Sequence, residues 1–403
     1  MSYENRRATA ALRVLDASGR PVANRTLRLE QRTHDFLFGC GAFDAIVYAN
    51  GRQDDPFWQE RMARWLDLFN YGTMSFYWGR YEPEEGKSEF GSRMNASRFL
   101  VSRGKKVKGH PLCWHTACAD WLLKYDDKTI LDKQLARIHR EVSGFAGVID
   151  IWDVINEAVI MPEFDRYDNA ITRICRRYGH VTLIKEVFDA ARAANPKALL
   201  LINDFNLSEK YAALIRQCLD AGTPIGAIGL QTHQHQGYMG AEKLNAILRR
   251  YEGFGLPLHF TENTLVSGHL LPPHIVDLND YQIPEWPTTP EGEARQAKEW
   301  EEMLRLLFAH PRVAAVTGWD FTDGAWLGAP SGFLTVDNRV KPAYRALERL
   351  IHGEWRTVGD IRTDEYGRAE AAGFKGGYVL KDGDRSGALH LGGAEGPVNV
   401  ILQ

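Results

Sequence analysis

Two glutamates come directly after short apolar runs that are typical of strands. Glu157 follows the run at 149–154, with Ile155 and Asn156 between, and Glu262 follows Thr261 after the run at 257–260. Glycoside cleavage requires two carboxyl groups: a protonated one for the leaving oxygen, and an ionised one that attacks or stabilises the anomeric carbon. Either glutamate alone is more typical of a solvated loop charge. Together, with an asparagine before one of them, they favour a catalytic pair.

Aromatic rings and hydrogen-bonding side chains follow three other apolar runs. An indole ring offers an apolar face to the C–H groups of a sugar, and imidazole and amide groups can bind its hydroxyls. The candidate sugar-binding residues from these segments are His110, Trp114, Gln231, His233, Trp319 and Trp326.

Eight apolar runs alternate with amphipathic segments between residues 36 and 352, and this pattern predicts a (β/α)8 TIM barrel, an α/β fold. Polar residues at the carboxyl ends of such strands form the functional face. A doubly wound sheet is the alternative, but no Gly-rich phosphate loop opens any of the helices. The predicted strands are 36–39, 68–75, 106–110, 149–154, 198–202, 227–230, 257–260 and 313–318, and the clearest helices are 129–143, 181–194, 208–221, 241–254 and 293–309. The proline-rich segment 268–292 is predicted to be a long loop on the active face.

Both ends of the chain read as strands. Residues 8–31 predict two strands, and several more follow from about residue 355. Two strands alone are marginal in water, so we expect the termini to meet in one small accessory β-sandwich. Two independent strand decorations are the alternative. The predicted domains are 1–35 and 353–403, which share the sandwich, and 36–352, the catalytic barrel.

Composition excludes several classes of function. The 403 residues include 49 Lys and Arg against 52 Asp and Glu, a net charge of −3 without long charge runs. This balance favours neither nucleic acid nor a membrane surface as a partner. The five cysteines are scattered and odd in number, which is typical of free thiols in a reducing compartment. The first residues lack the apolar run of a secretory signal, so we expect a cytoplasmic protein. The sequence does not indicate an oligomeric state.

The motifs in their order resemble glycoside hydrolase family 10, the group dominated by endo-β-1,4-xylanases. The segment 152–158, Trp-Asp-Val-Ile-Asn-Glu-Ala, looks like the acid/base signature of that family. The resemblance also takes in 109–115, 203–206, 231–233, 261–262 and 319–326.

The resemblance implies a role for each site residue. Glu157 would be the general acid/base, Glu262 the nucleophile, and Asn156 the partner of the sugar 2-hydroxyl. His110, Trp114, Gln231, His233 and Trp319 would line the same subsite, with Trp326 nearby. The reaction would be double displacement with retention, and a raised pKa is expected for Glu157. This chemistry requires no metal and no organic cofactor.

The sequence departs from the family at two places. Where the family usually has Glu-Asn-x-Met-Lys-Trp, which binds the next glycone sugar, this chain has Thr-Met-Ser-Phe-Tyr-Trp at 73–78, so Tyr77 takes the lysine position. Thr264 replaces an aspartate that commonly orients the subsite histidine. The sequence therefore predicts a retained catalytic subsite and a rebuilt second subsite, lined by Tyr77. We expect action on short β-linked xylo-oligosaccharides or on terminal and aryl β-glycosides rather than on polymer.

Three other readings remain open. The chain could be an ordinary endo-β-1,4-xylanase. It could be a metal-dependent hydrolase, because His233 and His235 form a His-x-His pair that suits zinc. It could be a non-catalytic carbohydrate-binding barrel, because fold alone does not prove turnover. The basic cluster of Lys105, Lys106 and Lys108 is interpreted as a solvated strand start.

Overall fold

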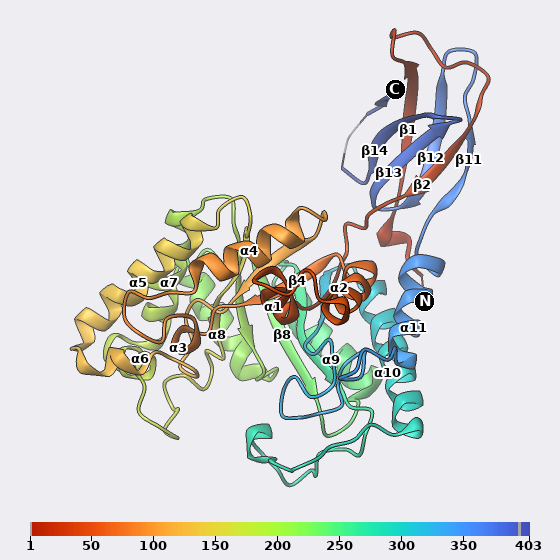
Figure 1. The fold of residues 1–403 in the computed structure, drawn as a ribbon. Coiled ribbons are helices and arrows are strands. Elements are labelled where there is room, and N and C mark those ends of the chain that lie inside the picture. The colour runs from red at the N-terminus through yellow and green to blue at the C-terminus, as the bar shows by residue number, and fades with distance from the viewer. Residues whose placement is uncertain (1, 394–395) are drawn as a thin grey trace. The chain divides into compact units, whose positions relative to one another are not determined.

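A computed structural model describes residues 2–393 and 396–403 (Figure 1). The chain divides into two compact units. One holds Phe38–Glu299 and Arg312–Pro342, and the other holds the chain up to Leu37 with Trp300–Pro311 and Ala343–Gln403. The predicted border at residue 36 lies close to the first division. On the carboxyl side, the second unit also takes 300–311 and 343–352, which we assigned to the barrel. The three-part domain division therefore stays a prediction.

Eight parallel strands close into a barrel, in the order β10-β3-β4-β5-β6-β7-β8-β9. Each overlaps one of the eight apolar runs, so the predicted (β/α)8 barrel is confirmed. The strands are β3 (Leu37–Gly41), β4 (Tyr71–Ser75), β5 (Lys106–His110), β6 (Ile151–Asn156), β7 (Leu199–Asp204), β8 (Ala227–Gln234), β9 (Leu258–Leu265) and β10 (Val313–Gly318). β8 and β9 continue past their apolar runs, so His233 and Glu262 stand within strands.

Helices alternate with these strands, and local signals explain where several begin. Asp55 accepts a hydrogen bond from Phe57 N at the start of α2, where Pro56 opens the helix, and Asp126 caps α5 through Thr129 N. The helices are α1 (Phe43–Ala49), α2 (Pro56–Leu68), α3 (Trp78–Tyr81), α4 (Phe90–Val101), α5 (Asp127–Gly144), α6 (Ala170–Tyr178), α7 (His180–Ala194), α8 (Glu209–Asp220), α9 (Gly240–Glu252), α10 (Pro290–Ala309) and α11 (Pro342–Glu348), with shorter turns η1 (Glu4–Arg6), η2 (Asp120–Lys124), η3 (Leu278–Asp280) and η4 (Arg349–Glu354). None of the described helices is long and apolar enough to cross a membrane.

The predicted loop 268–292 is mostly irregular, but it differs from the prediction in two ways. It contains η3, and α10 begins within it at Pro290. A small apolar cluster of its own, including Leu271 and Trp286, packs against Val266 and Ala329. This packing explains how a long proline-rich segment keeps a defined path on the face of the barrel.

Strands from both ends of the chain form one β-sandwich, as expected. Its sheets are β12-β1-β15 and β11-β2-β13-β14. β1 pairs antiparallel with β12 and parallel with β15, so neither terminus completes a sheet alone. Alternating residues such as Val14, Leu29 and Leu380 fill the space between the sheets. The strands are β1 (Arg7–Asp16), β2 (Thr26–Gln31), β11 (Val358–Arg362), β12 (Arg368–Phe374), β13 (Gly376–Asp382), β14 (Arg385–Leu391) and β15 (Val398–Leu402).

Candidate active site

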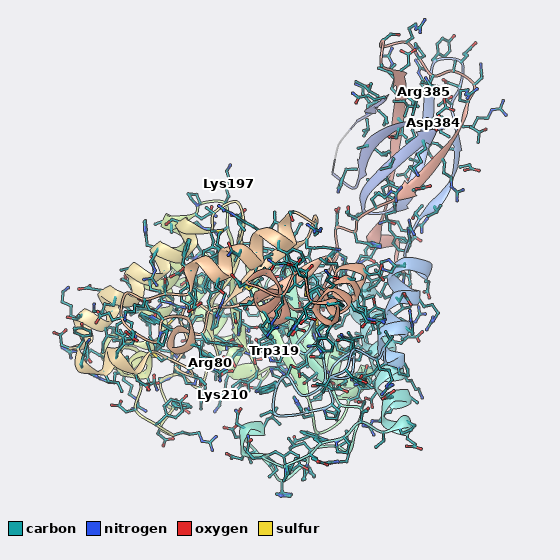
Figure 2. All side chains as sticks on the ribbon, viewed as in Figure 1. Arg80, Lys197, Lys210, Trp319, Asp384 and Arg385 are labelled. Atoms are coloured by element: carbon teal, nitrogen blue, oxygen red, sulfur yellow. The ribbon has the colours of Figure 1, made fainter. Side chains whose placement is uncertain are left out.

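The predicted site residues gather at the carboxyl end of the barrel. In Figure 2, Trp319, Arg80 and Lys210, which follow β10, β4 and β7, lie at one end of the barrel, and Lys197, which precedes β7, lies at the other. The ten predicted residues come from six strand ends and are linked by the hydrogen bonds, ion pairs and ring contacts described below. The structure therefore brings all of them together. Their individual roles stay predictions.

Both glutamates have left-handed backbone conformations. The φ angle of Glu157 is 53° and that of Glu262 is 57°. Residues with a side chain rarely adopt this region, and such strain is typical of functional sites. The Glu157 N–H donates to the carbonyl of Asn203, 2.8 Å away, which fixes the turn that leaves β6. The sequence pattern does not predict this backbone strain.

Glu157 has few polar neighbours. The indole Nε1 of Trp114 donates to its Oε2 at 2.9 Å, and Nε2 of His115 lies 3.9 Å from the same oxygen. Burial raises the pKa of the Glu157 carboxyl to about 8. The Trp114 hydrogen bond opposes this shift, and the negative charges of Glu262 and Asp204 add to it. Glu157 is therefore largely protonated at neutral pH, as expected for a general acid.

Glu262 is surrounded by groups that favour the ionised form. Nδ2 of Asn203 donates to its Oε1 at 2.7 Å, His233 Nε2 lies 3.2 Å from Oε2, and His110 Nδ1 lies 3.8 Å from Oε1. Burial acts to raise the pKa of Glu262, but the charge of His110 and the hydrogen bond with His233 outweigh it, so the pKa is lowered. The two carboxyl groups thus have opposite shifts, the arrangement that separates an acid from a nucleophile.

Asn203 links the two halves of the site and is missing from the predicted site residues. Besides Glu262, its Nδ2 donates to Oδ1 of Asn156 at 2.8 Å, and its own Oδ1 accepts from Thr261 at 2.7 Å. Gln231 Nε2 donates to the same Asn156 oxygen at 2.9 Å. The position of Asn203 at the end of a predicted strand, within the motif at 203–206, was the signal that could have identified it.

Aromatic rings enclose the remaining part of the site. The Tyr77 ring lies 5.8 Å from His110 and 5.6 Å from Trp114, between centroids. His233 lies 4.4 Å from the Trp326 ring and 5.9 Å from the Trp319 ring. The bulky Tyr77 side chain therefore stands beside His110 and Trp114, and it occupies the sequence position where the family resemblance implies a lysine.

The prediction that Lys105, Lys106 and Lys108 form a solvated cluster is wrong for Lys108. Its side chain is fully buried, and its Nζ lies 2.6 Å from Oδ2 of Asp153. The same oxygen contacts His110 Nδ1 at 2.7 Å. Burial acts to raise the pKa of Asp153, but the contacts with Lys108 and His110 together outweigh it, and the pKa is lowered. The alternation of β5 places Lys106, Lys108 and His110 on one face of the strand, but only Lys106, its first residue, is exposed.

The His-x-His pair does not form part of a metal cluster in the described chain. No group of three or more His, Cys, Asp or Glu side chains there could hold a metal ion. His233 and His235 instead contact Thr264, at 3.4 Å and 3.2 Å from its Oγ1. Thr264 thus lies beside His233, at the position where the family commonly has an aspartate.

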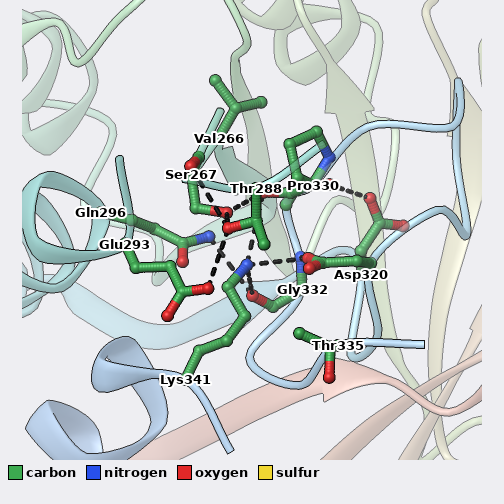
Figure 3. Close-up of polar contacts among 12 residues, drawn as sticks. Val266, Ser267, Thr288, Glu293, Gln296, Asp320, Pro330, Gly332, Thr335 and Lys341 are labelled. Carbon is green, nitrogen blue, oxygen red and sulfur yellow. Dashed lines mark hydrogen bonds and ion pairs between the residues drawn. The ribbon is translucent and has the colours of Figure 1, made fainter. Parts of the chain in front are cut away.

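A buried polar cluster holds the loop that carries Trp319 and Trp326 (Figure 3). Lys341 Nζ donates to Asp323 Oδ1 at 2.8 Å and to the Gly332 carbonyl at 2.8 Å. Across the cluster, Ser267 and Gln296 donate to the carbonyls of Pro330 and Gly332. The loop after β10 is therefore fixed to the start of the loop after β9, which follows Glu262.

Comparisons with known proteins agree with this geometry. Residues 69–349 match the family described as Glycosyl hydrolase family 10. The chain belongs to glycosyl hydrolase family 10. The predicted family is thus confirmed, and the protein is a xylanase-like glycoside hydrolase with a carbohydrate substrate.

Its family 10 relatives are moderately similar. An endo-1,4-beta-xylanase/feruloyl esterase from Xylanibacter ruminicola is 28% identical, over 70% of this chain and 41% of the relative. An endo-1,4-beta-xylanase from Geobacillus stearothermophilus is 29% identical, over 61% of this chain and 75% of the relative. A solved GH10 structure from Paenibacillus barcinonensis has a TM-score of 0.65 at 24% identity, covering 79% of this chain and 96% of that chain. This last likeness shows the fold alone.

Proposed function

We propose that this family 10 protein is a retaining β-glycosidase that acts on short xylo-oligosaccharides or on terminal and aryl β-glycosides rather than on polymeric xylan. The single observation that supports the chemistry best is the pair of opposite pKa shifts: Glu157 raised to about 8 by burial, and Glu262 lowered by His110 and His233 against burial.

The reaction proceeds in two displacements. Glu262 attacks the anomeric carbon, and Glu157 gives its proton to the glycosidic oxygen as the leaving group departs. The glycosyl ester on Glu262 then has no negative charge, so one of the charges that raises the Glu157 pKa is lost. Glu157 is now ionised, takes a proton from water, and the water attacks the anomeric carbon to release Glu262. Asn156, Asn203 and Gln231 hold the sugar and the nucleophile in position.

Tyr77 supports the preference for short substrates. Its ring packs against His110 and Trp114, and its sequence position is the one that the family resemblance assigns to a residue binding the second glycone sugar. Loss of the usual Glu, Asn and Lys at 73–78 removes the hydrogen bonds that would hold that sugar. A substrate whose glycone is a single sugar needs none of them.

An ordinary endo-β-1,4-xylanase is the second candidate. The two relatives from Xylanibacter ruminicola and Geobacillus stearothermophilus favour it, since one is an endo-1,4-beta-xylanase/feruloyl esterase and the other an endo-1,4-beta-xylanase. The two candidates differ in the glycone that the enzyme requires, so they can be separated by substrate choice.

The test is hydrolysis of aryl β-xyloside, β-glucoside, β-cellobioside and β-xylobioside, together with xylan, by the wild type and by Glu157→Gln and Glu262→Gln. We expect the monosaccharide glycosides to react and Glu262→Gln to abolish the reaction. Xylan should react poorly. Reaction of the disaccharide glycosides alone, with rapid mid-chain cleavage of xylan, would favour the endo-xylanase. Sugar binding without any hydrolysis would favour the non-catalytic reading.

A further inference from the structure

An ion-pair bridge joins two loops at the mouth of the barrel. Arg166, between β6 and α6, contacts Oδ2 of Asp277 with one terminal nitrogen, and its other terminal nitrogen lies 2.6 Å from Oδ1 of Asp280. Asp277 caps η3 and Asp280 is its last residue, and η3 lies in the loop between β9 and α10. The bridge thus connects the loop after Glu157 with the loop after Glu262. In Figure 1, these loops approach each other at the lower edge of the barrel.

The order of the strands in the barrel shows which part of the mouth the bridge spans. β7 and β8 separate β6 from β9, and the connections after them, 205–208 and 235–239, are short. The bridge therefore spans the part of the rim that follows β7 and β8. β4, which precedes Tyr77, stands opposite β8, with three strands between them on either side. The Arg166 bridge and Tyr77 consequently lie on opposite sides of the mouth.

Hydrogen bonds to neighbouring segments of the barrel hold each loop within a few residues of the bridge. Nε2 of Gln236 donates to the Ile275 carbonyl at 2.7 Å, which holds the loop after β9 to the loop after β8. Arg176, on α6, donates to the carbonyls of Pro162 and Phe164 at 2.7 Å and 3.0 Å. These contacts are independent of Arg166, so removing its side chain leaves both loops attached to the barrel.

We propose that the Arg166 bridge limits the length of the leaving group. This inference rests on the proposed function. If the glycone ends near Tyr77, the leaving group must extend to the opposite side of the mouth, past the loops after β7 and β8. A short aglycone ends before the bridge, whereas a polymeric one must pass it. Arg166, Asp277 and Asp280 then determine specificity without touching the reacting atoms.

The bridge is exposed enough to respond to salt. About half of the Arg166 side chain is accessible, and exposed ion pairs are weak and screened by added salt. Opening the bridge should therefore require little free energy. We expect high ionic strength to increase cleavage of long substrates without changing the hydrolysis of a small aryl xyloside.

The experiment uses Arg166→Ala and the double variant Asp277→Asn/Asp280→Asn. Asparagine retains the Oδ1 atom with which Asp277 accepts from Asn279 N at 2.9 Å, so η3 keeps its cap. The matched control is Lys185→Ala, which removes an exposed Lys185–Asp189 pair on α7. The measurement is kcat/KM for aryl β-xyloside and for xylohexaose, with the lengths of the products, at low and high salt.

Both bridge variants should raise kcat/KM for xylohexaose several-fold and leave kcat/KM for the aryl xyloside unchanged. They should also abolish the salt effect, while the control behaves as the wild type. If the ratio of kcat/KM for xylohexaose to kcat/KM for the aryl xyloside is the same in the bridge variants as in the wild type, the inference is overturned and the proposed function stands. A wild type that prefers xylohexaose and xylan would overturn the proposed preference and the role of the bridge together. Loss of aryl xyloside activity in the bridge variants would also contradict it, because the bridge would then support the catalytic residues.

Discussion

Glu157 and Glu262 occupy the same barrel end but differ in charge at neutral pH because their neighbours differ. Glu157 receives one indole N–H in a buried setting, and its pKa rises to about 8. Glu262 is more enclosed than Glu157, yet His110 and His233 stabilise its charge, so its pKa falls. The pH dependence of kcat/KM should therefore fall on the alkaline side as Glu157 ionises, near pH 8, and on the acid side as Glu262 is protonated.

Trp114→Phe tests the tuning of Glu157. The Trp114 N–H stabilises the Glu157 carboxylate, so removing it should raise the pKa of Glu157 further and move the alkaline limb of kcat/KM to higher pH. Trp121→Phe is the control, because Trp121 Nε1 donates to the Glu82 carbonyl at 2.9 Å. A limb that moves to lower pH, or that moves equally in the control, would contradict the assignment.

The residues of the candidate site were predictable from sequence to an unequal degree. Glu157 and Glu262 follow apolar runs, and that pattern is local. Asn203 and Lys108 act through partners far along the chain: Asn203 reaches Glu262 across 59 positions. Only the closed barrel brings such residues together. The sequence therefore could not predict that Asn203 donates to Glu262 or that Lys108 is buried.

At the scale of elements, the apolar runs predict where the strands lie but not where they end. β8 and β9 extend through Gln234 and Leu265 because the two strands stay paired with each other as far as these residues. The apolar run alone ends these strands too early. Inside the barrel, Lys108 of β5 and Asp153 of β6 form an ion pair that is fully removed from water. A buried charge without its partner is strongly destabilising.

Lys108→Met should leave Asp153 with His110 alone and reduce the free energy of unfolding by about 3–5 kcal/mol. The pKa of Asp153 should rise, because the Lys108 charge that lowers it is gone. Lys106→Met, on the same strand but exposed, should change stability by no more than about 0.5 kcal/mol. Denaturant unfolding of both variants provides the measurement, and an equal, small effect would mean that the pair contributes little.

At the scale of the whole chain, the sandwich requires both termini. β1 pairs with β12 and β15, and β2 pairs with β11 and β13. The sequence predicted this assembly because neither end alone could bury a sheet face. It did not predict that 300–311 and 343–352 belong to the same compact unit as the sandwich, since helical periodicity does not reveal which neighbour a helix packs on.

Leu380→Ala tests whether the sandwich contributes to stability separately from catalysis. Leu380 is fully buried between the sheets, so its truncation should cost about 2–5 kcal/mol in unfolding free energy. The kcat/KM for an aryl glycoside at 25 °C should stay unchanged. Ile401→Ala removes a half-exposed side chain of β15 and should have a small effect. A loss of activity in folded Leu380→Ala would show that the sandwich acts on the reaction.

The assignment of the two glutamates is tested most directly by azide rescue of Glu157→Ala and Glu262→Ala on an aryl β-xyloside with a good leaving group. In Glu157→Ala, the glycosyl ester on Glu262 should form and be trapped by azide as the β-xylosyl azide. In Glu262→Ala, azide should attack from the nucleophile's side and give the α-xylosyl azide. The reverse pattern of anomers, or rescue of neither variant, would contradict the account.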